Sequence, residues 1–317
     1  MDLSVCEVLH PGVQTTGEDL GRTKWRHLGV ARSGAMDMHA MGVANALVGN
    51  PVHAAGLEIA LSGPSLELHG SCQIALTGAP IRATWNDVPL PMGRPLTLPA
   101  GKLQLRAVER GARSWLAVRG GIQVPSLMGS ASTDLRGGFG GCEGRAVKQG
   151  DRFKVRSVAV EGGPVLPKWW VETYGLYGCP ENVLRYLPAA DPSALALARH
   201  KWLIHASSNR QGLRMQGQHL PVELTERQSE PVCEGTVQLP PDGQPILLLA
   251  DAQTIGGYAR LGYVLACDLG RASQLRLGDS VRFEPVDRMQ AHALMVQSRR
   301  DLARTLLSIR QARVSMA

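Results

Sequence analysis

Two runs of short, turn-separated strands constrain the fold of this chain more than any other feature. Between residues 65 and 124 the sequence reads as LELHGSCQIALTG, IRATWNDVPL, LTLPAGKLQLRAV and SWLAVRGGIQV, with Gly, Pro and Asn-Asp between the segments. A similar series covers residues 219–286. Turns at such close intervals indicate hairpins rather than strands joined by crossover helices. We therefore predict a mainly β protein built from barrels or sandwiches, with few helices.

The length and a boundary region between the two series favour two domains. A chain of 317 residues with 44% hydrophobic content can bury two cores. The segment 160–183 is rich in proline, glycine and aromatic residues, which is typical of a connection. We predict an N-terminal domain over residues 1–165, a connecting region over 166–200 and a C-terminal domain over 201–317.

Two helices are expected. An apolar stripe at helical spacing runs from residue 36 to 47 and is followed by Gly49, Asn50 and Pro51, which end helices. The second predicted helix covers residues 288–313. Its expected inward positions are Ala293, Leu294, Leu302, Leu306 and Ile309.

The charge distribution argues against a nucleic-acid partner. The formal net charge is +7, but the stretch after Asp287 holds six arginines against Asp301, which leaves only +2 for the rest. Aromatic residues make up 4%, too few for a surface on which bases stack. We interpret the basic stretch as the solvated face of a helix.

The chain carries no signal of export or membrane insertion. No run of 18 apolar residues occurs, and residues 1–20 lack a basic start with an apolar core. The six cysteines are far apart and show no zinc spacing, so we expect reduced, mostly buried thiols and no metal site. We expect a cytoplasmic protein with no membrane contact.

The segment 8–58 mixes reactive polar groups with glycines, as binding sites do. Its loop 15–22 places Thr16, Asp19 and Arg22 close together, with Gly17 and Gly21 between them. Such a loop can hold an anionic or amide substrate. An ion pair from Asp19 to Arg22 that only braces a turn is an equally good interpretation.

Further candidates follow in the same segment. Ser33 or Asp37 is expected to cap the first helix or to bind a ligand at its start. Asn45 lies beside the apolar stripe, and Glu58 follows apolar residues. A carboxylate in that setting needs a partner, for which Arg22 is one candidate.

A second polar cluster occurs about two hundred residues later. Residues 234–245 read as two strands around a Pro-Pro-Asp-Gly turn, which Gln238 and Gln244 flank. A plain hairpin explains Asp242 and Gly243 but not the two glutamines, whose amides can bind an amide substrate. The glycine-rich segment 129–145 lacks both common phosphate-loop patterns, so we interpret it as a tightly turned loop. Its minor candidates for anion contact are Ser130, Ser132 and Arg145.

These segments carry a resemblance. The strings PGVQTT, SGAMD and ANALVGN, with SNRQGLR and LLADAQTIGGY later in the chain, resemble the biotin-dependent carboxyltransferase or allophanate hydrolase subunit 2 family. Its stand-alone bacterial members are the KipA-like proteins, described as the C subunit of the ATP-dependent 5-oxoprolinase. The resemblance implies two cyclophilin-like β-barrel domains. It also implies one site built from residues 15–58 and 238–258.

The implied reaction is the ATP-dependent opening of 5-oxo-L-proline to L-glutamate. This hydrolase would work with a KipI-like B subunit and a LamB/YcsF-like A subunit. It would use ATP, with or without Mg²⁺. The ATP site would lie on this chain or be shared with a partner. Stabilisation of developing negative charge falls to Arg22 and Arg210, and proton transfer to Asp19 or Glu58. The expected substrate-binding residues are Thr16, Ser33, Asp37, Asn45, Gln238, Asp242, Gln244, Thr254 and Tyr258.

Two alternatives remain open. One is carboxyl transfer from carboxybiotin to urea or a related amide; none of the six lysines stands in a Met-Lys-Met context, so biotin would arrive on another chain. The other is a non-catalytic KipA-like regulatory protein. Glu18 departs from the family, which usually has glutamine there, and an ionised glutamate only accepts hydrogen bonds.

Overall fold

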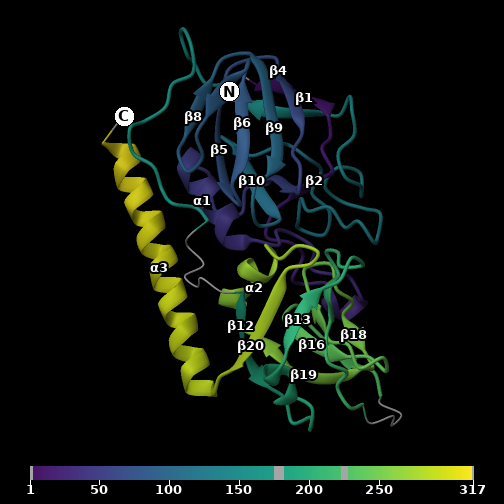
Figure 1. Cartoon of the computed structure of the whole chain (residues 1–317). Helices are drawn as coiled ribbons and strands as arrows, with labels where there is room; N and C mark the ends of the chain where they lie inside the picture. The colour runs from purple at the N-terminus through teal and green to yellow at the C-terminus, as the bar shows by residue number, and fades with distance from the viewer. Residues whose placement is uncertain (1–2, 175–181, 223–227, 316–317) are drawn as a thin grey trace. The chain divides into compact units, whose positions relative to one another are not determined.

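A computed structural model describes residues 3–174, 182–222 and 228–315. The chain forms two compact units. Unit 1 comprises Met1–Gly21, Asp37–Leu176 and Leu302–Ala317, and unit 2 comprises Arg22–Met36 and Tyr177–Asp301. Strands dominate both units (Figure 1). The prediction of a mainly β protein with few helices is therefore confirmed.

Unit 1 arranges its strands in two antiparallel sheets. The first sheet has the order β11-β1-β4-β9-β6-β7, and the second has the order β2-β3-β10-β5-β8. The strands of the first sheet are β1 (Leu3–His10), β4 (Ser65–Leu68), β6 (Ile81–Trp85), β7 (Val88–Leu90), β9 (Gly101–Val108) and β11 (Arg152–Arg156). Those of the second are β2 (Gln14–Glu18), β3 (Gly56–Ala60), β5 (Cys72–Gly78), β8 (Leu96–Leu98) and β10 (Arg113–Val118).

The core of unit 1 follows from alternating side chains. Along β4, Leu66 and Leu68 are buried while their neighbours are half-exposed, as expected for a sheet with one buried face. The helix α1 (Met38–Val48) packs against β5 and β10 of the second sheet. It ends at Gly49, whose φ of 76° favours glycine. The predicted first helix and its stop signal are thus confirmed.

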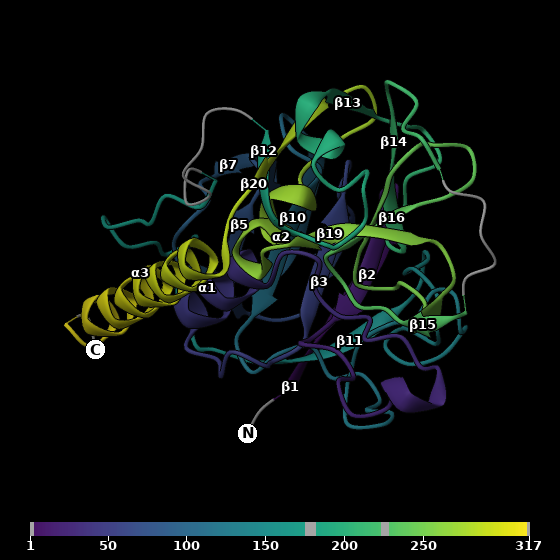
Figure 2. The ribbon, with the colours of Figure 1, turned by 90° about the horizontal axis from the view of Figure 1, so that it is seen from below.

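Unit 2 is a closed barrel, which Figure 2 shows from below. The strands follow the order β12-β19-β16-β17-β14-β13-β20 around the barrel. Their bounds are β12 (Val183–Pro188), β13 (Lys201–Ile204), β14 (Gly212–Gln216), β16 (Thr236–Leu239), β17 (Ile246–Leu248), β19 (Ala259–Val264) and β20 (Ser280–Pro285). The two short strands β15 (Glu230–Pro231) and β18 (Ile255–Gly256) pair separately.

Aromatic side chains lie within the mostly aliphatic core of the barrel. Trp202 and Tyr186 are fully buried, and the Tyr186 ring meets Phe283 edge to face at 5.9 Å. The helix α2 (Ala266–Ala272) follows β19. Two short 3₁₀ segments, η1 (Arg26–Leu28) and η3 (Ala196–Arg199), complete the unit. The strands β16 and β17 form the hairpin that the Pro-Pro-Asp-Gly turn predicts, with Gly243 at φ 67°.

The long helix α3 (Arg288–Val314) covers the range expected for the second helix. Ile309 is buried, and Leu294, Leu302 and Leu306 are half-buried. The prediction was wrong for Ala293, which is exposed, since Ala291 supplies the buried position at that end instead. In the part of the chain that the structure describes, no helix is both long and apolar enough to cross a membrane.

The two units divide the chain differently from the predicted ranges. Residues 22–36 fall within the predicted N-terminal domain, but Arg22–Met36 belongs to unit 2 because hydrogen bonds tie this segment to that barrel. The end of α3 belongs to unit 1. There a Cβ on Gly49 would clash with the guanidinium of Arg313, which therefore covers the C-terminus of α1. Cations are favourable at that end of a helix.

The cysteines are partly as expected. All five that the structure describes are free; Cys6, Cys72 and Cys142 are buried, whereas Cys233 is exposed. Burial raises the pKa of Cys72 to about 12 and that of Cys142 to about 11, so neither is a thiolate at neutral pH. Cys179 lies outside the described residues.

Candidate functional site

Asp19 lies at the centre of a hydrogen-bonded cluster in unit 1. Its Oδ1 accepts from the Ser130 hydroxyl at 2.6 Å, the Ser132 hydroxyl at 2.6 Å and the Gly21 N–H at 2.8 Å. Its Oδ2 accepts from the Ala131 N–H at 2.7 Å. No lysine or arginine among the described residues forms an ion pair with this carboxylate. The ion pair from Asp19 to Arg22, which was the alternative interpretation of this loop, is therefore not found.

The pKa of Asp19 shows which influence prevails. Burial acts to raise this pKa, but the hydrogen bonds from Ser130, Ser132 and two backbone N–H groups outweigh it and hold the pKa below its usual value. The group is thus a carboxylate at neutral pH with four acceptor positions filled. Such a group fixes the loop at residues 130–132 and is poorly suited to carry a proton near neutrality.

Glu58 has a cationic partner on the neighbouring strand. It lies on β3, is 2% exposed, and its Oε1 is 3.2 Å from Nη1 of Arg113 on β10. Glu58 stands opposite Trp115 in the register of these two strands, and Arg113 is two residues away on the same face. The expectation that this buried carboxylate needs a partner is confirmed, and strand pairing supplies Arg113. A further contact of Glu58 with Arg22 stays a prediction.

In unit 2 a buried arginine joins three segments of chain. Arg210 binds Asp251 through two bonds, Nε to Oδ2 at 2.9 Å and Nη2 to Oδ1 at 3.0 Å. The same Nη2 donates to the carbonyl of Gly34 at 2.7 Å. Both charged side chains are at most 3% exposed. This bidentate geometry gives the pair a fixed orientation.

The segment that reads Arg-Ser-Gly-Ala is held on the barrel beside this pair. The Ser33 N–H donates to the Ala250 carbonyl at 2.9 Å, and Arg32 forms two bonds with Glu234, at 2.8 and 3.0 Å. Ser33 has a left-handed φ of 54°, which is uncommon for a residue with a side chain. Its hydroxyl is buried and has no partner among the described residues. Backbone strain with an unsatisfied hydroxyl is typical of functional sites.

Gln238 shows a second unsatisfied group in unit 2. It is 1% exposed, and its Oε1 accepts from Nε2 of Gln253 at 3.3 Å. Its own Nε2 has no partner in the described part of the chain. A Cβ on Gly256 would lie only 2.5 Å from this nitrogen, so the glycine leaves room for it. Gln238 thus offers an amide donor, the property for which it was predicted to bind substrate.

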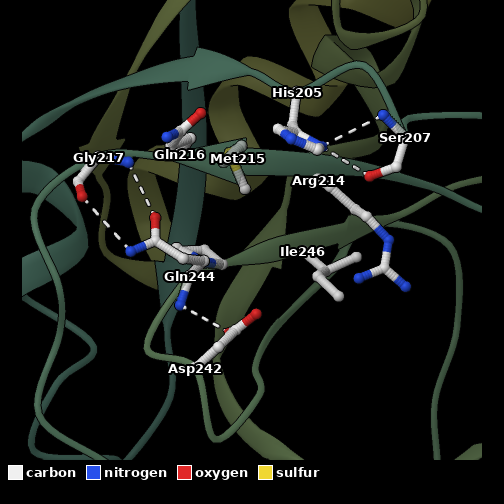
Figure 3. Close-up of a pocket in the computed structure, with 10 residues that line it drawn as sticks. His205, Ser207, Arg214, Met215, Gln216, Gly217, Asp242, Gln244 and Ile246 are labelled. Carbon is white, nitrogen blue, oxygen red and sulfur yellow. Dashed lines mark hydrogen bonds between the residues drawn. The ribbon is translucent and has the colours of Figure 1, made fainter.

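Gln244 and Asp242 line a surface pocket of about 360 Å³ on the same barrel, and Figure 3 shows it. We call it the Arg214 pocket, and it is lined by His205, Ser207, Arg214, Met215, Gln216, Gly217, Asp242, Gln244, Pro245 and Ile246. Gln244 accepts from the Gly217 N–H at 2.8 Å and donates to the Gly217 carbonyl at 3.4 Å. The two predicted glutamines therefore have separate partners, Gln253 for one and Gly217 for the other.

Several predicted site residues have structural partners. Asp37 caps α1 by accepting from the Ala40 N–H at 2.9 Å. Asn45 donates to the carbonyls of Val52 and Ala54 and fixes the loop after α1. Arg145 binds Asp151 and Glu143, and both raise its pKa. Ligand roles for Asp37, Asn45 and Arg145 would compete with these contacts.

The remaining candidate residues differ in exposure. Thr16, Arg22 and Thr254 are buried, at 2%, 1% and 7% exposure, whereas Tyr258 is exposed. The Arg22 N–H donates to the Arg32 carbonyl at 2.7 Å, which holds the start of unit 2 together. Whether residues 15–58 and 238–258 share one site stays a prediction.

A comparison with protein families gives one match. The model for the carboxyltransferase domain, subdomains A and B, covers residues 28–285. The chain belongs to this family. Both series of strands and most predicted site residues lie within that range; Thr16, Asp19 and Arg22 precede it.

Three proteins are similar to this chain in sequence or in structure. It is 39% identical over 289 residues to the 5-oxoprolinase C subunit of Escherichia coli K12, covering 87% of this chain and 90% of that protein. The crystal structure of TTHA0988 superposes with a TM-score of 0.79 at 33% identity, covering 89% of this chain and 56% of that one. The K. lactis urea amidolyase gives a TM-score of 0.84 at 27% identity over 95% of this chain. The chain spans about half of the TTHA0988 chain and 20% of the urea amidolyase chain.

Sequence reasoning missed several polar residues of this family member. Arg113, Asp251 and Glu234 were not proposed as partners of Glu58, Arg210 and Arg32, because all three pairs are distant in sequence. Arg214 could have been found from alternation. In β14, Leu213 and Met215 are buried while Arg214 is exposed, so the period of two places its side chain on the outer face.

Proposed function

We propose that this protein is the C subunit of an ATP-dependent 5-oxoprolinase, which opens 5-oxo-L-proline to L-glutamate together with a KipI-like B subunit, and with a LamB/YcsF-like A subunit. One observation carries the proposal. The chain matches 90% of the length of the Escherichia coli 5-oxoprolinase C subunit, with 39% identity, so the likeness extends over nearly that whole protein. A cytoplasmic location goes with this function and stays a prediction.

Opening a cyclic amide requires donors for the negative charge that develops on the carbonyl oxygen. The proposed donors are Arg22 and Arg210, with Gln238 recognising the amide. Two observations support a site in unit 2: the fixed orientation of Arg210 by Asp251 and Gly34, and the strained Ser33 with its unsatisfied hydroxyl. We assign Ser33 to substrate contact, since its hydroxyl both donates and accepts.

The carboxylates take different roles in this proposal. Asp19 positions the loop at residues 130–132, because taking up a proton would disrupt its four hydrogen bonds. Glu58 is 2% exposed, and its Oε1 lies 3.2 Å from the Arg113 guanidinium on the neighbouring strand. A carboxylate held by one cationic contact has fewer bonds to break than Asp19 when it takes part in proton transfer. We therefore assign proton transfer to Glu58 rather than to Asp19.

The glycine-rich segment does not fit the phosphates of ATP. The hydroxyls of Ser130 and Ser132 donate to Asp19, and the Arg145 guanidinium is engaged by Asp151 and Glu143. These groups are the ones that a phosphate would need. We assign ATP no site on this segment and derive no step through it.

The test is reconstitution. The chain is purified with its A-type and B-type partner proteins, and release of glutamate from 5-oxoproline is followed with and without ATP. We expect turnover only when all three proteins and ATP are present. The Ser33→Ala variant should lower kcat and retain assembly, which is checked by co-purification; unchanged kcat would remove Ser33 from the site. Absence of turnover in the intact complex would favour a regulatory binding protein.

Carboxyl transfer to urea or a related amide is the second candidate. Membership of the carboxyltransferase family and the TM-score of 0.84 to the K. lactis urea amidolyase favour it. Urea and a carboxybiotin-bearing carrier protein are the competing substrates in the same assay. Consumption of the carboxyl group with urea, and no glutamate from 5-oxoproline, would replace the first proposal by this one.

A further inference from the structure

The Arg214 pocket has the volume of a small-molecule site on unit 2. Its volume is about 360 Å³, within the range that ligand pockets occupy. The strands β14 and β17 form its floor, where Arg214 and Ile246 are cross-strand partners. Figure 3 shows both side chains on the pocket side, with the aliphatic group of Ile246 beside the guanidinium. Pro245 also lines the pocket, whereas the Met215 side chain belongs to the barrel core.

One side of the pocket carries an uncommitted cation. The backbone N–H and carbonyl of Arg214 both bond to the Ser208 hydroxyl, which fixes the main chain at this residue. Its guanidinium forms no hydrogen bond or ion pair with any described residue, and in Figure 3 no dashed line reaches it. A guanidinium has five donors arranged to match a carboxylate.

His205 adds a donor on the same side. Its Nδ1 accepts from the Ser207 N–H at 3.2 Å and lies 2.7 Å from the Ser207 hydroxyl. Because a backbone N–H can only donate, Nδ1 is the acceptor and the proton of the neutral ring is on Nε2. The Nε2–H can then donate to a ligand in the pocket.

The other side of the pocket presents an acceptor. One oxygen of Asp242 accepts from the Gln244 N–H at 3.0 Å, and the second is available at the surface. The Gln244 side chain is fixed by both polar groups of Gly217, so it shapes the wall. No ion pair joins Arg214 to Asp242 in the described structure, and both residues line the same pocket.

We propose that the Arg214 pocket binds a small carboxylic acid that also carries a nitrogen donor, with its carboxylate on Arg214 and a neighbouring N–H or ammonium group on Asp242. The apolar floor fits the short carbon skeleton between these groups. Two ligands share this chemistry, 5-oxoproline with its ring N–H and glutamate with its ammonium group. The choice of these two probes rests on the proposed function, while the pocket itself does not.

The experiment is calorimetric titration of the purified chain, without ATP or partner proteins. The probes are 5-oxo-L-proline, L-glutamate and 2-pyrrolidinone, which has the ring amide but no carboxylate. We expect the two acids to bind and 2-pyrrolidinone not to bind. The Arg214→Gln variant should bind the acids about 10- to 100-fold more weakly, the loss expected for a charged hydrogen-bonded contact. Arg214→Lys, which keeps the charge without the planar fork, should lie between.

The matched control is Arg282→Gln. Arg282 is an exposed arginine on β20 of the same barrel and does not line the pocket. This variant should keep the wild-type affinity. Asp242→Asn should weaken glutamate more than 5-oxoproline, because an ammonium group gains more from a negative partner than an amide N–H does. Of 5-oxoproline and glutamate, the one that binds the wild-type protein more tightly is the ligand for which the pocket is suited.

Two outcomes would overturn the proposal: no binding of either acid to wild type, or equal affinity in Arg214→Gln and wild type with unchanged thermal unfolding. The proposed function fails separately. If Arg214→Gln loses binding but the complete wild-type complex makes no glutamate, the ligand site is supported and the 5-oxoprolinase function is contradicted. If the complex turns over normally with Arg214→Gln and binding is also unchanged, the 5-oxoprolinase function is supported and the ligand site is contradicted.

Discussion

Two carboxylates of this protein, the partly buried Asp19 in unit 1 and the buried Asp251 in unit 2, are stabilised in opposite ways. Four neutral donors surround Asp19, two hydroxyls and two backbone N–H groups. One guanidinium binds both oxygens of Asp251. The first arrangement leaves the charge of Asp19 without a counter-charge among the described residues, whereas the second cancels the charge of Asp251. A partly buried carboxylate can thus be stabilised by dipoles alone, and the two carboxylates should respond differently to substitution.

The largest effect is expected at the ion pair. Asp251→Ala leaves the Arg210 guanidinium buried without its counter-charge, so we expect the free energy of unfolding to fall by about 3–5 kcal/mol. Urea unfolding of the purified chain measures it. The double variant Arg210→Met with Asp251→Leu should recover part of the loss, because two apolar side chains replace two charges. A smaller loss than that of Asp19→Asn would show that the buried ion pair is not the more sensitive of the two arrangements.

Asp19→Asn is expected to cost less. The amide keeps one acceptor oxygen but turns an NH₂ group toward N–H or hydroxyl donors, which removes charge-assisted bonds and costs about 2–3 kcal/mol. Unfolding in urea, as for Asp251→Ala, gives the value. Because Asp19 is proposed to position a loop, Asp19→Asn should also increase amide hydrogen exchange at residues 130–132. An unchanged exchange rate there would contradict the positioning role.

The dipole-stabilised carboxylate also predicts a pH dependence. The pKa of Asp19 is lower in the folded protein than in the unfolded chain, so its contribution to stability is present above the usual range of aspartate and is lost as pH falls through the folded pKa. The stability difference between wild type and Asp19→Asn should therefore be largest near neutral pH and shrink below about pH 4. A difference that stays constant down to acid unfolding would contradict this assignment.

Glu58→Gln should have the smallest effect. Its partner Arg113 is 12% exposed, and glutamine can still accept one hydrogen bond from it. We expect a loss of about 1 kcal/mol in the free energy of unfolding. The same variant tests catalysis, since a proton carrier at Glu58 requires that kcat of the reconstituted complex fall much further than stability does. Wild-type kcat would remove Glu58 from that role.

Much of the fold could be predicted from local pattern. Alternation and turn residues predict the strands of both units, the hairpin of β16 and β17, and the stop of α1 at Gly49. The assignment of Arg22–Met36 to unit 2 could not be predicted. It depends on long-range bonds, such as that of Arg32 with Glu234, which no local pattern contains.

Less of the candidate site could be predicted. The sequence indicates that Asp19, Ser33 and Gln238 are unusual, but their properties depend on partners far along the chain. Ser130 and Ser132, which lower the pKa of Asp19, are 111 and 113 positions away. Which side chains line one pocket also depends on strands that are distant in the sequence. Asp242 and Gln244 were therefore predicted as site residues, but Arg214, the cation of the same pocket, was not.

The chain passes between the two units more than once, which limits how they can be expressed separately. Unit 2 starts with Arg22–Met36 and resumes only at Tyr177, and unit 1 takes back Leu302–Ala317. No single cut in the gene can therefore yield either half intact. A fragment that starts at residue 177 would lack the stretch of chain that carries Ser33 and the carbonyl that binds Arg210. Supplying residues 22–36 as a separate peptide should restore that fragment, in the manner of split-protein complementation.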